Sequence, residues 1–475
     1  MFQGANDDEN GATMSSSLKL ANFRGTLIRP NDEPYDEARS VFNGMMDRYP
    51  AAIARCTSTD DVVAVVNMAN SDGLPLSVYG GGHSVTGSAV VDGGLCLDLR
   101  GMRNITVDPG SKTARVEGGA VWGEIDAATQ QHGLAVTGGR VSTTGVGGLT
   151  LGSGSGWTER SFGFTCDNLL KAEVVTADGR VVIASNDENP DLFWGLRGGG
   201  GNFGVVTAFH FRLHDLGPIV LGGMLMFPAT AAHAIVRFYR DFMAAAPNEL
   251  GTVLAFITAP PEEFVPVEAR GKPAIAIAGC HTGSIDEASK AFQPLRDLDS
   301  IVDMIGPTPY VAIQQMLDNA APKGIRNYWT ADSIAELTDD AVDVLVDYAT
   351  NPVSPFTQVI LAPGGGAIAE VADEATAFGQ RNAPWTVHYA SMWADSADDQ
   401  INIAYTKELA ASMKPWTTGQ VYLNFIGNEG SGRVAASFGP EKYQRLTELK
   451  RKWDPTNLFR HNQNIPPAPP ESRAQ

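Results

Sequence analysis

Short apolar runs separated by polar and glycine-rich segments begin near residue 51 and predict a strand, a helix and a second strand. The first run, Ala51–Cys56, has the length and apolar content of a short strand. The next segment, residues 57–68, begins with three hydroxyl side chains that can cap a helix and continues with valines at helical spacing. Gly73 stands where a C-terminal cap belongs, and Leu76–Tyr79 has the pattern of the next strand. The pattern therefore predicts a strand–helix–strand unit that ends in a glycine-rich loop.

The pattern continues to residue 213 as short strands with one helix and one long irregular segment. The turn signals Asp108-Pro-Gly-Ser111 and Ala177-Asp-Gly-Arg180 separate apolar runs, and the second is typical of a hairpin. An amphipathic helix is predicted from Val121 to His132. Residues 137–156 are rich in glycine and have no stable period, and a loop of this length in a compact domain is usually functional. The predicted strands are Leu95–Leu99, Ile105–Val107, Thr113–Val116, Ala172–Thr176, Arg180–Ala184 and Val205–Leu213.

From about Leu216 to residue 420, β-like runs alternate with helical patterns. This alternation is typical of an α+β domain whose antiparallel sheet carries helices on one face. We therefore expect a disordered tail at 1–24, a first domain at 25–215, a second at 216–420 and a C-terminal segment at 421–475. The β-like runs that support the second domain are Gly222–Phe227, Val253–Ile257, Ala274–Gly279, Gln358–Ala362 and Thr386–Met392, and its predicted helices are Ala231–Ala244 and Thr338–Thr350. The C-terminal segment has a predicted helix from about Gly439 to Trp453.

The charge and composition of the 475 residues restrict the class of protein. The formal net charge of −19 argues against a nucleic-acid-binding protein, which would present a basic face. No apolar run approaches the roughly 20 residues that cross a bilayer, and the polar N-terminus contains no signal-peptide core. Four widely spaced cysteines without a C-x-x-C pair favour an intracellular, cytoplasmic location. No metal-binding motif is present, so no metal site is predicted.

Glycine is concentrated in clusters, and the first cluster follows the predicted strand Leu76–Tyr79. Gly80, Gly81 and Gly82 precede His83, which is followed by Ser84 and Gly87. Alone, this stretch is equally well a glycine turn with a surface histidine or a ligand loop with a reactive histidine. The segment Gly199–Gly204 matches G-x-G-x-x-G, but a strand follows it instead of a helix, so a Rossmann fold is rejected. Serial glycine loops can still aim backbone N–H groups at the pyrophosphate of a dinucleotide.

Four motifs, which occur along the chain in the same order as in a known family, make the sequence similar to that family. They are Gly80-Gly-Gly-His-Ser84, Gly145-Val-Gly-Gly-Leu-Thr-Leu-Gly152, Leu196–Gly204 and a tail running from Tyr422-Leu-Asn424 to Asn462-Gln-Asn-Ile465. They resemble the berberine-bridge-enzyme-like branch of the vanillyl-alcohol oxidase superfamily of flavoproteins. The resemblance implies a two-domain α+β flavoprotein: a bipartite FAD-binding domain, completed by the C-terminal segment, and a middle substrate domain with a helix-covered antiparallel sheet.

The resemblance implies that His83 is bonded covalently to the methyl carbon at position 8 of the flavin. A covalent bond withdraws electron density from the flavin and raises its reduction potential. Many members of the family carry a cysteine, shortly before Gly145, that forms a second bond. Aligning the motif places Val141 at that position, and valine cannot form a thioether. We therefore predict FAD attached through His83 only.

The resemblance also assigns further site residues. It implies that Tyr422 is the catalytic base that removes a proton from the substrate hydroxyl, although a tyrosine packed in a strand is the alternative. His388 and Tyr389 are weak candidates for substrate contact, and Tyr328, Trp329 and Trp393 lie on the same predicted elements. The predicted cofactor-binding residues are His83, Tyr79, Gly80, Gly81, Gly82, Ser84, Gly87, Thr143, Thr144, Gly145, Gly147, Gly148, Gly152, Gly199, Gly200, Asn202, Phe203, Gly204, Val205, Tyr422, Asn424 and Asn462.

The predicted activity is that of an FAD-dependent oxidase. A small organic substrate, an alcohol or an amine, transfers a hydride to the flavin, and O2 reoxidises the flavin to give H2O2. The alternatives are a dehydrogenase that uses another electron acceptor and a flavin-binding protein without oxidase activity. The fold does not choose among substrates, and the sequence does not indicate an oligomeric state.

Overall fold

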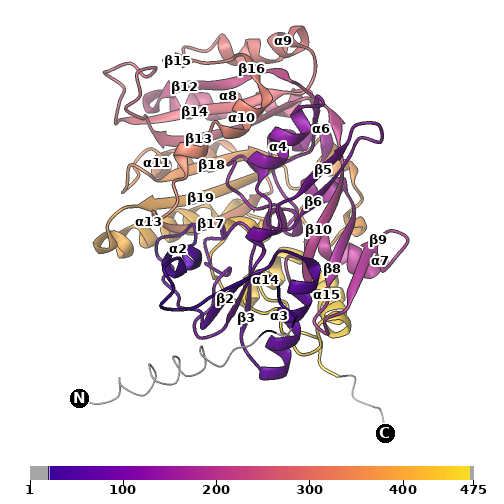
Figure 1. The fold of residues 1–475 in the computed structure, drawn as a ribbon. Coiled ribbons are helices and arrows are strands. Elements are labelled where there is room, and N and C mark those ends of the chain that lie inside the picture. The colour runs from indigo at the N-terminus through magenta and orange to yellow at the C-terminus, as the bar shows by residue number, and fades with distance from the viewer. Residues whose placement is uncertain (1–19, 21, 471–475) are drawn as a thin grey trace, which may run out of the picture.

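The computed structural model describes residue 20 and residues 22–470. The predicted disordered tail at 1–24 falls mostly on residues 1–19 and 21, which lie outside the described residues. Figure 1 shows the N-terminal and C-terminal parts of the chain together in the lower half, and the middle part of the chain as a separate layered sheet above them.

The first sheet contains the predicted strand–helix–strand unit. Strand β2 (Ala52–Arg55) leads into helix α3 (Thr59–Asp72), which ends at Gly73 in a left-handed conformation (φ 64°) before β3 (Leu76–Tyr79). The N-terminus of α3 is capped by Ser58, whose side chain accepts a hydrogen bond from the Asp61 N–H group. Strand β4 lies between β2 and β3 and is parallel to both, and β1 pairs antiparallel with β2. The bounds of these two strands are Leu95–Asp98 for β4 and Thr26–Ile28 for β1.

The second sheet has the order β5-β6-β10-β8-β9, and all of its neighbouring strands are antiparallel. Its core is built from apolar residues of the strands and of helices α4, α5, α7 and α15. Helix α5 lies inside the segment 137–156, so the prediction of one continuous loop there was wrong. The bounds are β5 (Ile105–Asp108), β6 (Thr113–Glu117), β8 (Leu169–Val175), β9 (Val181–Ser185), β10 (Val205–Arg212), α4 (Trp122–Gln130), α5 (Val146–Leu151), α7 (Pro190–Leu196) and α15 (Pro440–Trp453).

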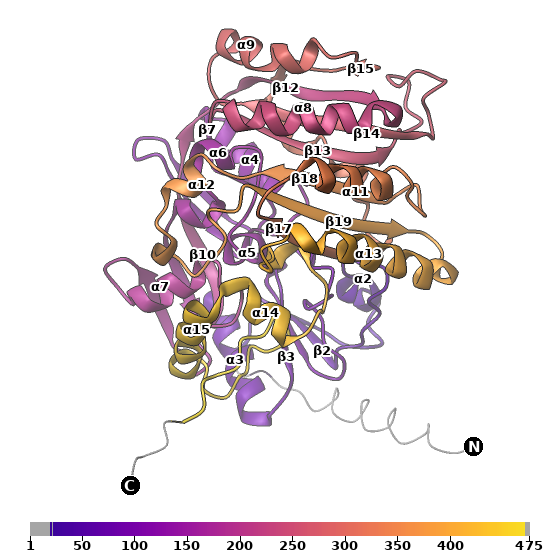
Figure 2. The ribbon, with the colours of Figure 1, turned by 180° about the vertical axis from the view of Figure 1, so that it is seen from behind.

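The third sheet is the predicted antiparallel sheet of the middle segment. Its order is β15-β12-β14-β13-β18-β19-β17, with β16 paired to β12. Helices α8, α11 and α13 lie in front of its strands in Figure 2 and cover one face. The bounds are β12 (Ile219–Pro228), β13 (Leu250–Thr258), β14 (Pro273–His281), β15 (Val302–Asp303), β16 (Gly306–Pro309), β17 (Arg326–Ile334), β18 (Gln358–Pro363), β19 (Trp385–Trp393), α8 (Ala232–Ala245), α9 (Ile285–Arg296), α11 (Asp339–Ala349) and α13 (Asp399–Met413).

The second face of the third sheet is turned toward the lower half of the molecule. Along β18 and β19, successive side chains point to opposite faces: Val359, Leu361 and Val387 enter the helix-covered core, and the residues between them do not. The remaining elements are α2 (Tyr35–Arg39), α6 (Glu159–Phe162), α10 (Tyr310–Gln315), α12 (Ala367–Glu370), α14 (Ser431–Phe438), the paired β7 (Leu134–Ala135) and β11 (His214–Asp215), and the short 3-10 helices η4 (Asp318–Ala320) and η8 (Leu423–Phe425).

The C-terminal segment returns to the lower half and is fixed there by a buried cation. The ammonium group of Lys450 on α15 forms an ion pair of 2.7 Å with Asp454, and both side chains are fully buried. The same ammonium donates to the backbone oxygen of Asn202 at 2.8 Å and to that of Phe459 at 2.9 Å. Lys450 thus joins the C-terminal segment to residues 199–204, which we call the third glycine loop. The first glycine loop is residues 80–87, and the second is residues 137–156. The domain limits at residues 215 and 420 stay a prediction.

Candidate cofactor and substrate site

A cavity of about 390 Å³ lies between the glycine loops of the lower half and the free face of the third sheet. All three predicted glycine loops line it, together with residues 461–463 of the C-terminal segment. The predicted site residues that line the cavity are Gly80, Gly81, Gly82, His83, Ser84, Thr144, Gly145, Gly147, Gly148, Gly152, Gly199, Gly200, Asn202, Gly204, Val205, His388, Asn424 and Asn462. Residues more than 370 positions apart in the sequence therefore meet at one site.

Five of the predicted cofactor-binding residues do not line this cavity. Tyr79 donates from its hydroxyl to the backbone oxygen of Ser40 at 2.8 Å, so its phenol points away. Phe203 is fully buried in the core of the second sheet. The other three are Gly87, which packs against Met46, Thr143, whose hydroxyl lies 3.4 Å from His83 Nε2, and Tyr422, which is described below.

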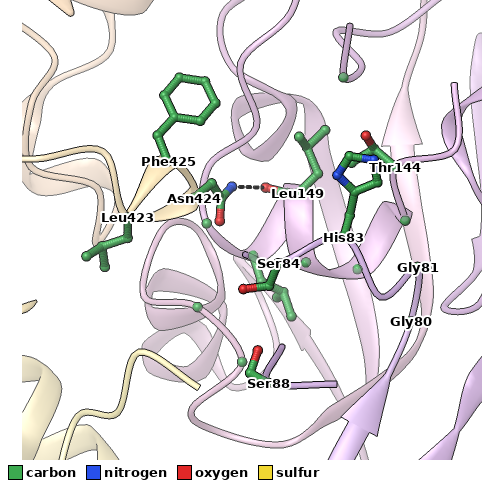
Figure 3. Close-up of a pocket in the computed structure, with 18 of the residues that line it drawn as sticks. Gly80, Gly81, His83, Ser84, Ser88, Thr144, Leu149, Leu423, Asn424 and Phe425 are labelled. Atoms are coloured by element: carbon green, nitrogen blue, oxygen red, sulfur yellow. Dashed lines mark hydrogen bonds between the residues drawn. The ribbon is translucent and has the colours of Figure 1, made fainter. Parts of the chain in front are cut away.

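His83 is presented by a loop that glycine makes possible. Gly82 has φ 67°, a value that residues with a side chain rarely adopt. The imidazole of His83 stacks on Phe42 with a centroid distance of 4.1 Å, and its Nε2 atom lies 3.4 Å from the Thr143 hydroxyl. Burial lowers the pKa of His83 to about 4, so the ring is neutral near pH 7. Figure 3 shows the ring beside Thr144, above the glycine loop. A neutral imidazole in this position can act as a nucleophile.

The first two glycine loops touch each other through their backbones. A Cβ atom added to Gly81 would lie 2.3 Å from the amide nitrogen of Gly145, and a Cβ atom added to Gly145 would lie 2.3 Å from that of Gly81. By contrast, a Cβ atom at Gly148 would meet no atom within 4 Å, because this glycine borders the cavity. The loops are packed against each other and leave their other side open for a ligand.

The hydroxyl of Tyr422 accepts hydrogen bonds from three N–H donors. They are the backbone amides of Gly154 at 3.0 Å and Ser155 at 3.1 Å, and the side-chain amide of Asn424 at 3.3 Å. Burial raises the pKa of Tyr422, and these hydrogen bonds oppose the rise because they favour the anion. The ring borders a second, small cavity of about 40 Å³, which shares the lining residues Ser155, Ala362, Thr386 and Phe425 with the main cavity. Tyr422 therefore lies at the edge of the main cavity.

Asn424 connects this edge to the second glycine loop. Its side-chain amide also donates to the backbone oxygen of Leu149 at 3.2 Å, as Figure 3 shows. On the far side of the cavity, Asn462 donates to the backbone oxygen of Gly201 at 2.9 Å. The side-chain oxygen of Asn462 and the Nε2 atom of His461 are buried without a hydrogen-bond partner in the described part of the chain. These two atoms are available to a bound ligand.

The free face of the third sheet forms the opposite wall of the cavity, which we call the roof face. On β19 the lining residues alternate, and Tyr389 between them is buried in the helix-covered core. Tyr389 is therefore not in the cavity, because consecutive strand residues point to opposite faces. Tyr328 and Trp393 do not line the cavity either, whereas Trp329 does. The roof face consists of Val253, Trp329, Gln358, Ile360, Ala362, Thr386, His388, Ala390 and Met392.

Sequence reasoning missed most of the roof face, although a signal was present. Residues 386, 388, 390 and 392 are spaced by two, so recognising one of them as a lining residue selects the other three.

Arg140, a cationic residue that borders the cavity, was also missed. It donates to the Ser155 hydroxyl and to the backbone oxygen of Gly156, both at 2.9 Å, and forms an ion pair with Glu159 at 3.0 Å. Its charge is therefore largely balanced within the protein.

The cavity fits a dinucleotide cofactor. Three glycine loops present backbone N–H groups with little side-chain cover, and such groups bind a pyrophosphate without basic residues. The space beside Gly148 and the unpartnered polar atoms of His461 and Asn462 supply room and hydrogen bonds for such a ligand. The fold and the site thus define a protein whose cavity suits a dinucleotide, with the roof face opposite the glycine loops.

Comparison with known proteins identifies the cofactor and the family. Residues 50–185 match the family model described as FAD binding domain, and residues 421–466 match the one described as berberine and berberine like. The chain is 32% identical over 470 residues to (R)-6-hydroxynicotine oxidase of Paenarthrobacter nicotinovorans, covering 96% of this chain and 99% of that protein. It is 29% identical over 463 residues to an FAD-linked oxidoreductase of Dictyostelium discoideum, covering 96% of this chain and 98% of that one.

Solved structures agree with the fold. The crystal structure of 6-hydroxy-D-nicotine oxidase from Arthrobacter nicotinovorans superposes with a TM-score of 0.85 at 29% identity, covering 95% of this chain and all of that one. Glucooligosaccharide oxidase of Acremonium strictum superposes with a TM-score of 0.84 at 25% identity, covering 94% and 96%. The chain belongs to the berberine-bridge-enzyme-like FAD-linked oxidoreductases of the vanillyl-alcohol oxidase superfamily. The predicted family, fold class and FAD-linked enzyme class are confirmed. In the described part of the chain, no helix is long and apolar enough to cross a membrane.

Proposed function

We propose that this FAD-linked oxidoreductase is an oxidase that removes a hydride from a small organic alcohol or amine bound below the roof face. The observation that carries the proposal is the cavity itself, since one wall is formed by His83 and the glycine loops and the opposite wall by the roof face. When bound, FAD supplies the two-electron acceptor for the hydride. The loops would hold FAD through backbone N–H groups, and Asn202, Asn424 and Asn462 would add side-chain contacts.

His83 is the single covalent attachment point in this proposal. Its neutral ring, stacked on Phe42, lines the cavity, and Val141 also lines it. In the described part of the chain no cysteine lines the cavity; Cys56, Cys96, Cys166 and Cys280 are all buried and free. The bond would replace the ring N–H of His83 and one C–H of the 8-methyl group, and the two electrons and two protons released would pass to O2 as H2O2. Acid precipitation tests this bond: the pellet of the wild type stays yellow, and the pellet of His83→Ala is colourless. Flavin released from the wild type into the supernatant would contradict it.

Tyr422 is the base in this proposal. Three N–H donors surround its oxygen, an arrangement that favours the phenolate needed to accept a substrate proton. Its position at the edge of the main cavity requires the substrate's hydroxyl or amine to approach Ser155 and Phe425, which border both cavities.

The choice of electron acceptor is tested separately. The enzyme is reduced anaerobically with a substrate found by screening for peroxide release, and oxygen is then admitted. Reoxidation within the turnover time supports an oxidase. Slow reoxidation, with fast reoxidation by an artificial acceptor, would indicate a dehydrogenase. A flavin that no compound reduces would indicate a flavin-binding protein without oxidase activity.

A further inference from the structure

The imidazole ring of His83 is contacted by two residues that belong to other parts of the chain. Phe42 stacks on the ring with a centroid distance of 4.1 Å and an interplanar angle of 17°. In addition, the hydroxyl of Thr143 lies 3.4 Å from the Nε2 atom of the ring, and either group can be the donor. The glycines before His83 place few steric limits on the backbone that carries it. The orientation of the ring therefore depends on how Phe42 and Thr143 are held.

Phe42 is held by residues 318–327, which we call the connecting segment because they lead from η4 into β17. The backbone oxygen of Phe42 accepts a hydrogen bond from the Gly324 N–H group at 2.9 Å. The next residue, Asn43, is buried, and its side-chain amide exchanges two hydrogen bonds of 3.0 Å with the backbone N–H group and oxygen of Asn327. Three hydrogen bonds thus fix the position of Phe42 relative to the connecting segment.

Thr143 is held by the same segment through one carboxylate. The Oδ1 atom of Asp318 accepts a hydrogen bond from the Ser142 N–H group at 2.8 Å, and its Oδ2 atom accepts one from the Ser142 hydroxyl at 2.6 Å. Hydrogen bonds to an ionised acceptor are the stronger kind, and two of them to one carboxylate fix Ser142 in position and in orientation. Thr143 follows Ser142 directly, so the placement of its hydroxyl against His83 also depends on the connecting segment.

The charge of Asp318 acts on the same ring. Burial lowers the pKa of His83, and the carboxylate of Asp318 opposes this change because a negative charge favours the positively charged ring. A histidine nitrogen that attacks carbon as a nucleophile gives the ring a positive charge until the ring N–H proton leaves. Asp318 therefore favours the charge that the ring carries while its bond to carbon forms.

We propose that the connecting segment orients the imidazole of His83 for its bond to FAD. Asp318 is the positioning residue in this arrangement, because it acts on the ring through Ser142 and Thr143. Attachment forms one C–N bond, breaks the ring N–H of His83 and one C–H of the 8-methyl group, and passes two electrons and two protons to O2 as H2O2. The inference rests on the proposed attachment through His83. It assigns part of the control of that bond to residues outside 50–185, the range that matches the FAD-binding family model.

The test follows attachment directly and does not require turnover. Wild type and Asp318→Asn are produced in cells depleted of riboflavin, and FAD is then added in air-saturated buffer. At each time point, total bound flavin is measured after gel filtration, and covalent flavin is measured in the acid-precipitated pellet. Asp318→Asn keeps the shape of the side chain but places an NH2 group against a donor of Ser142. We expect it to bind as much FAD as the wild type and to attach it at least about tenfold more slowly.

Two further comparisons separate positioning from folding. Thr143→Val removes the hydroxyl beside His83 and should slow attachment, whereas Thr143→Ser keeps a hydroxyl and should attach FAD at close to the wild-type rate. The matched control for Asp318 is Asp399→Asn. Asp399 on α13 forms an ion pair of 2.5 Å with Arg326 of the connecting segment, and neither of these two residues lines the cavity. We expect Asp399→Asn to attach FAD at the wild-type rate.

The inference is overturned if Asp318→Asn attaches FAD as fast as the wild type, or if Asp399→Asn slows attachment as much. It is also overturned if the covalent flavin of Asp318→Asn falls only in proportion to its total bound flavin. If Asp318→Asn does not fold, the Thr143 variants decide, and equal rates for Thr143→Val and Thr143→Ser overturn the inference. A wild-type pellet without flavin overturns the attachment itself, and the inference with it. If the expected rates hold and no compound reduces the flavin, the inference stands and the oxidase proposal fails.

Discussion

Gly81 and Gly145 meet back to back, with room for no side chain between them. A Cβ atom on either residue would lie 2.3 Å from the amide nitrogen of the other. Normal contacts begin near 3.4 Å, so Gly81→Ala or Gly145→Ala must separate the loops by about 1 Å. Because His83 follows Gly81 by two residues and Thr144 precedes Gly145, the shift changes the geometry of the cavity wall that His83 and the glycine loops form. A displacement of this size can lower kcat/KM by about 100-fold.

The control for these loop variants is Gly306→Ala. Gly306 lies on β16, away from the cavity, and an added Cβ atom there would meet no atom within 4 Å. We expect Gly306→Ala to keep the flavin content and kcat/KM of the wild type, and Gly81→Ala to lose both. Flavin content is measured from the ratio of visible to ultraviolet absorbance. Normal flavin content and rate in both loop variants would show that the contact has no role in forming the site.

Replacing Tyr422 with phenylalanine tests the base. The variant loses the hydroxyl that three N–H donors contact and keeps the ring that packs on Phe425 and Phe164. General-base catalysis contributes roughly 10²–10⁴-fold, so kcat should fall by a factor in that range. Burial raises the pKa of Tyr422, so the active phenolate becomes more abundant as pH rises. Wild-type kcat/KM should therefore increase toward alkaline pH, and this dependence should disappear in Tyr422→Phe. An identical pH profile in the two proteins would rule out Tyr422 as the base.

The local patterns in the sequence predict the strands and the glycine loops well, because each depends on neighbouring residues. Helix α5 was missed because it has only six residues, and two of them are the poor helix formers Gly147 and Gly148; burial of Val146 and Leu151 stabilises it instead. The environment of Tyr422 could not be predicted, because its hydrogen-bond donors Gly154 and Ser155 lie 267 or more positions away in the sequence. Contacts of this kind depend on the tertiary fold.

The positions of the candidate substrate residues His388 and Tyr389 also depend partly on local sequence and partly on the tertiary fold. The spacing of residues along β19 separates His388 from Tyr389, since adjacent residues of a strand face opposite ways. Which face is the cavity, however, depends on the helices that cover the other one. The aromatic contacts of His388 also come from distant elements, with Trp329 on β17 and Phe425 in η8. The sequence alone therefore divides the residues of β19 between two faces of the sheet. It does not identify which face lines the cavity.

Lys450→Met is expected to weaken the attachment of the C-terminal segment. Lys450 and Asp454 are both fully buried, and removing the cation leaves the carboxylate of Asp454 without its cationic partner, with the backbone N–H groups of Leu458 and Phe459 still donating to it. Breaking a buried ion pair in this way costs about 3–5 kcal/mol in the free energy of unfolding. Because Lys450 also donates a hydrogen bond to the backbone of Asn202, the third glycine loop should lose order and FAD should bind less tightly.

The matched control is Lys452→Met on the same helix. Lys452 pairs with Asp191, but its side chain is 60% exposed, and an exposed pair contributes about 0–1 kcal/mol. Urea unfolding followed by circular dichroism measures both variants. Equal destabilisation by the two substitutions would show that burial of the Lys450 pair does not determine its contribution.

Asp126 makes the stability of the protein depend on pH in a direction opposite to that of most carboxylates. Asp126 lies on α4, is buried, and accepts a single side-chain hydrogen bond, from Gln314 at 3.1 Å. Burial raises its pKa from 3.8 to about 7, so the folded protein favours the protonated acid. In the unfolded chain the same group ionises near pH 4. Its contribution to stability is therefore complete below pH 4, decreases as pH rises from 4 to 7, and stays at its lowest value above pH 7.

Asp126→Asn should remove this dependence, because an amide cannot ionise and keeps the shape of the acid. At pH 8 the variant should be more stable than the wild type by roughly 2–4 kcal/mol in the free energy of unfolding, and at pH 4 the two should be equally stable. Chemical denaturation at pH 4, 6 and 8 measures the difference, which should grow steadily across this range. A difference that is the same at all three pH values would indicate that Asp126 does not change its protonation on unfolding, and that hydrogen bonding to Gln314 accounts for the effect of the substitution.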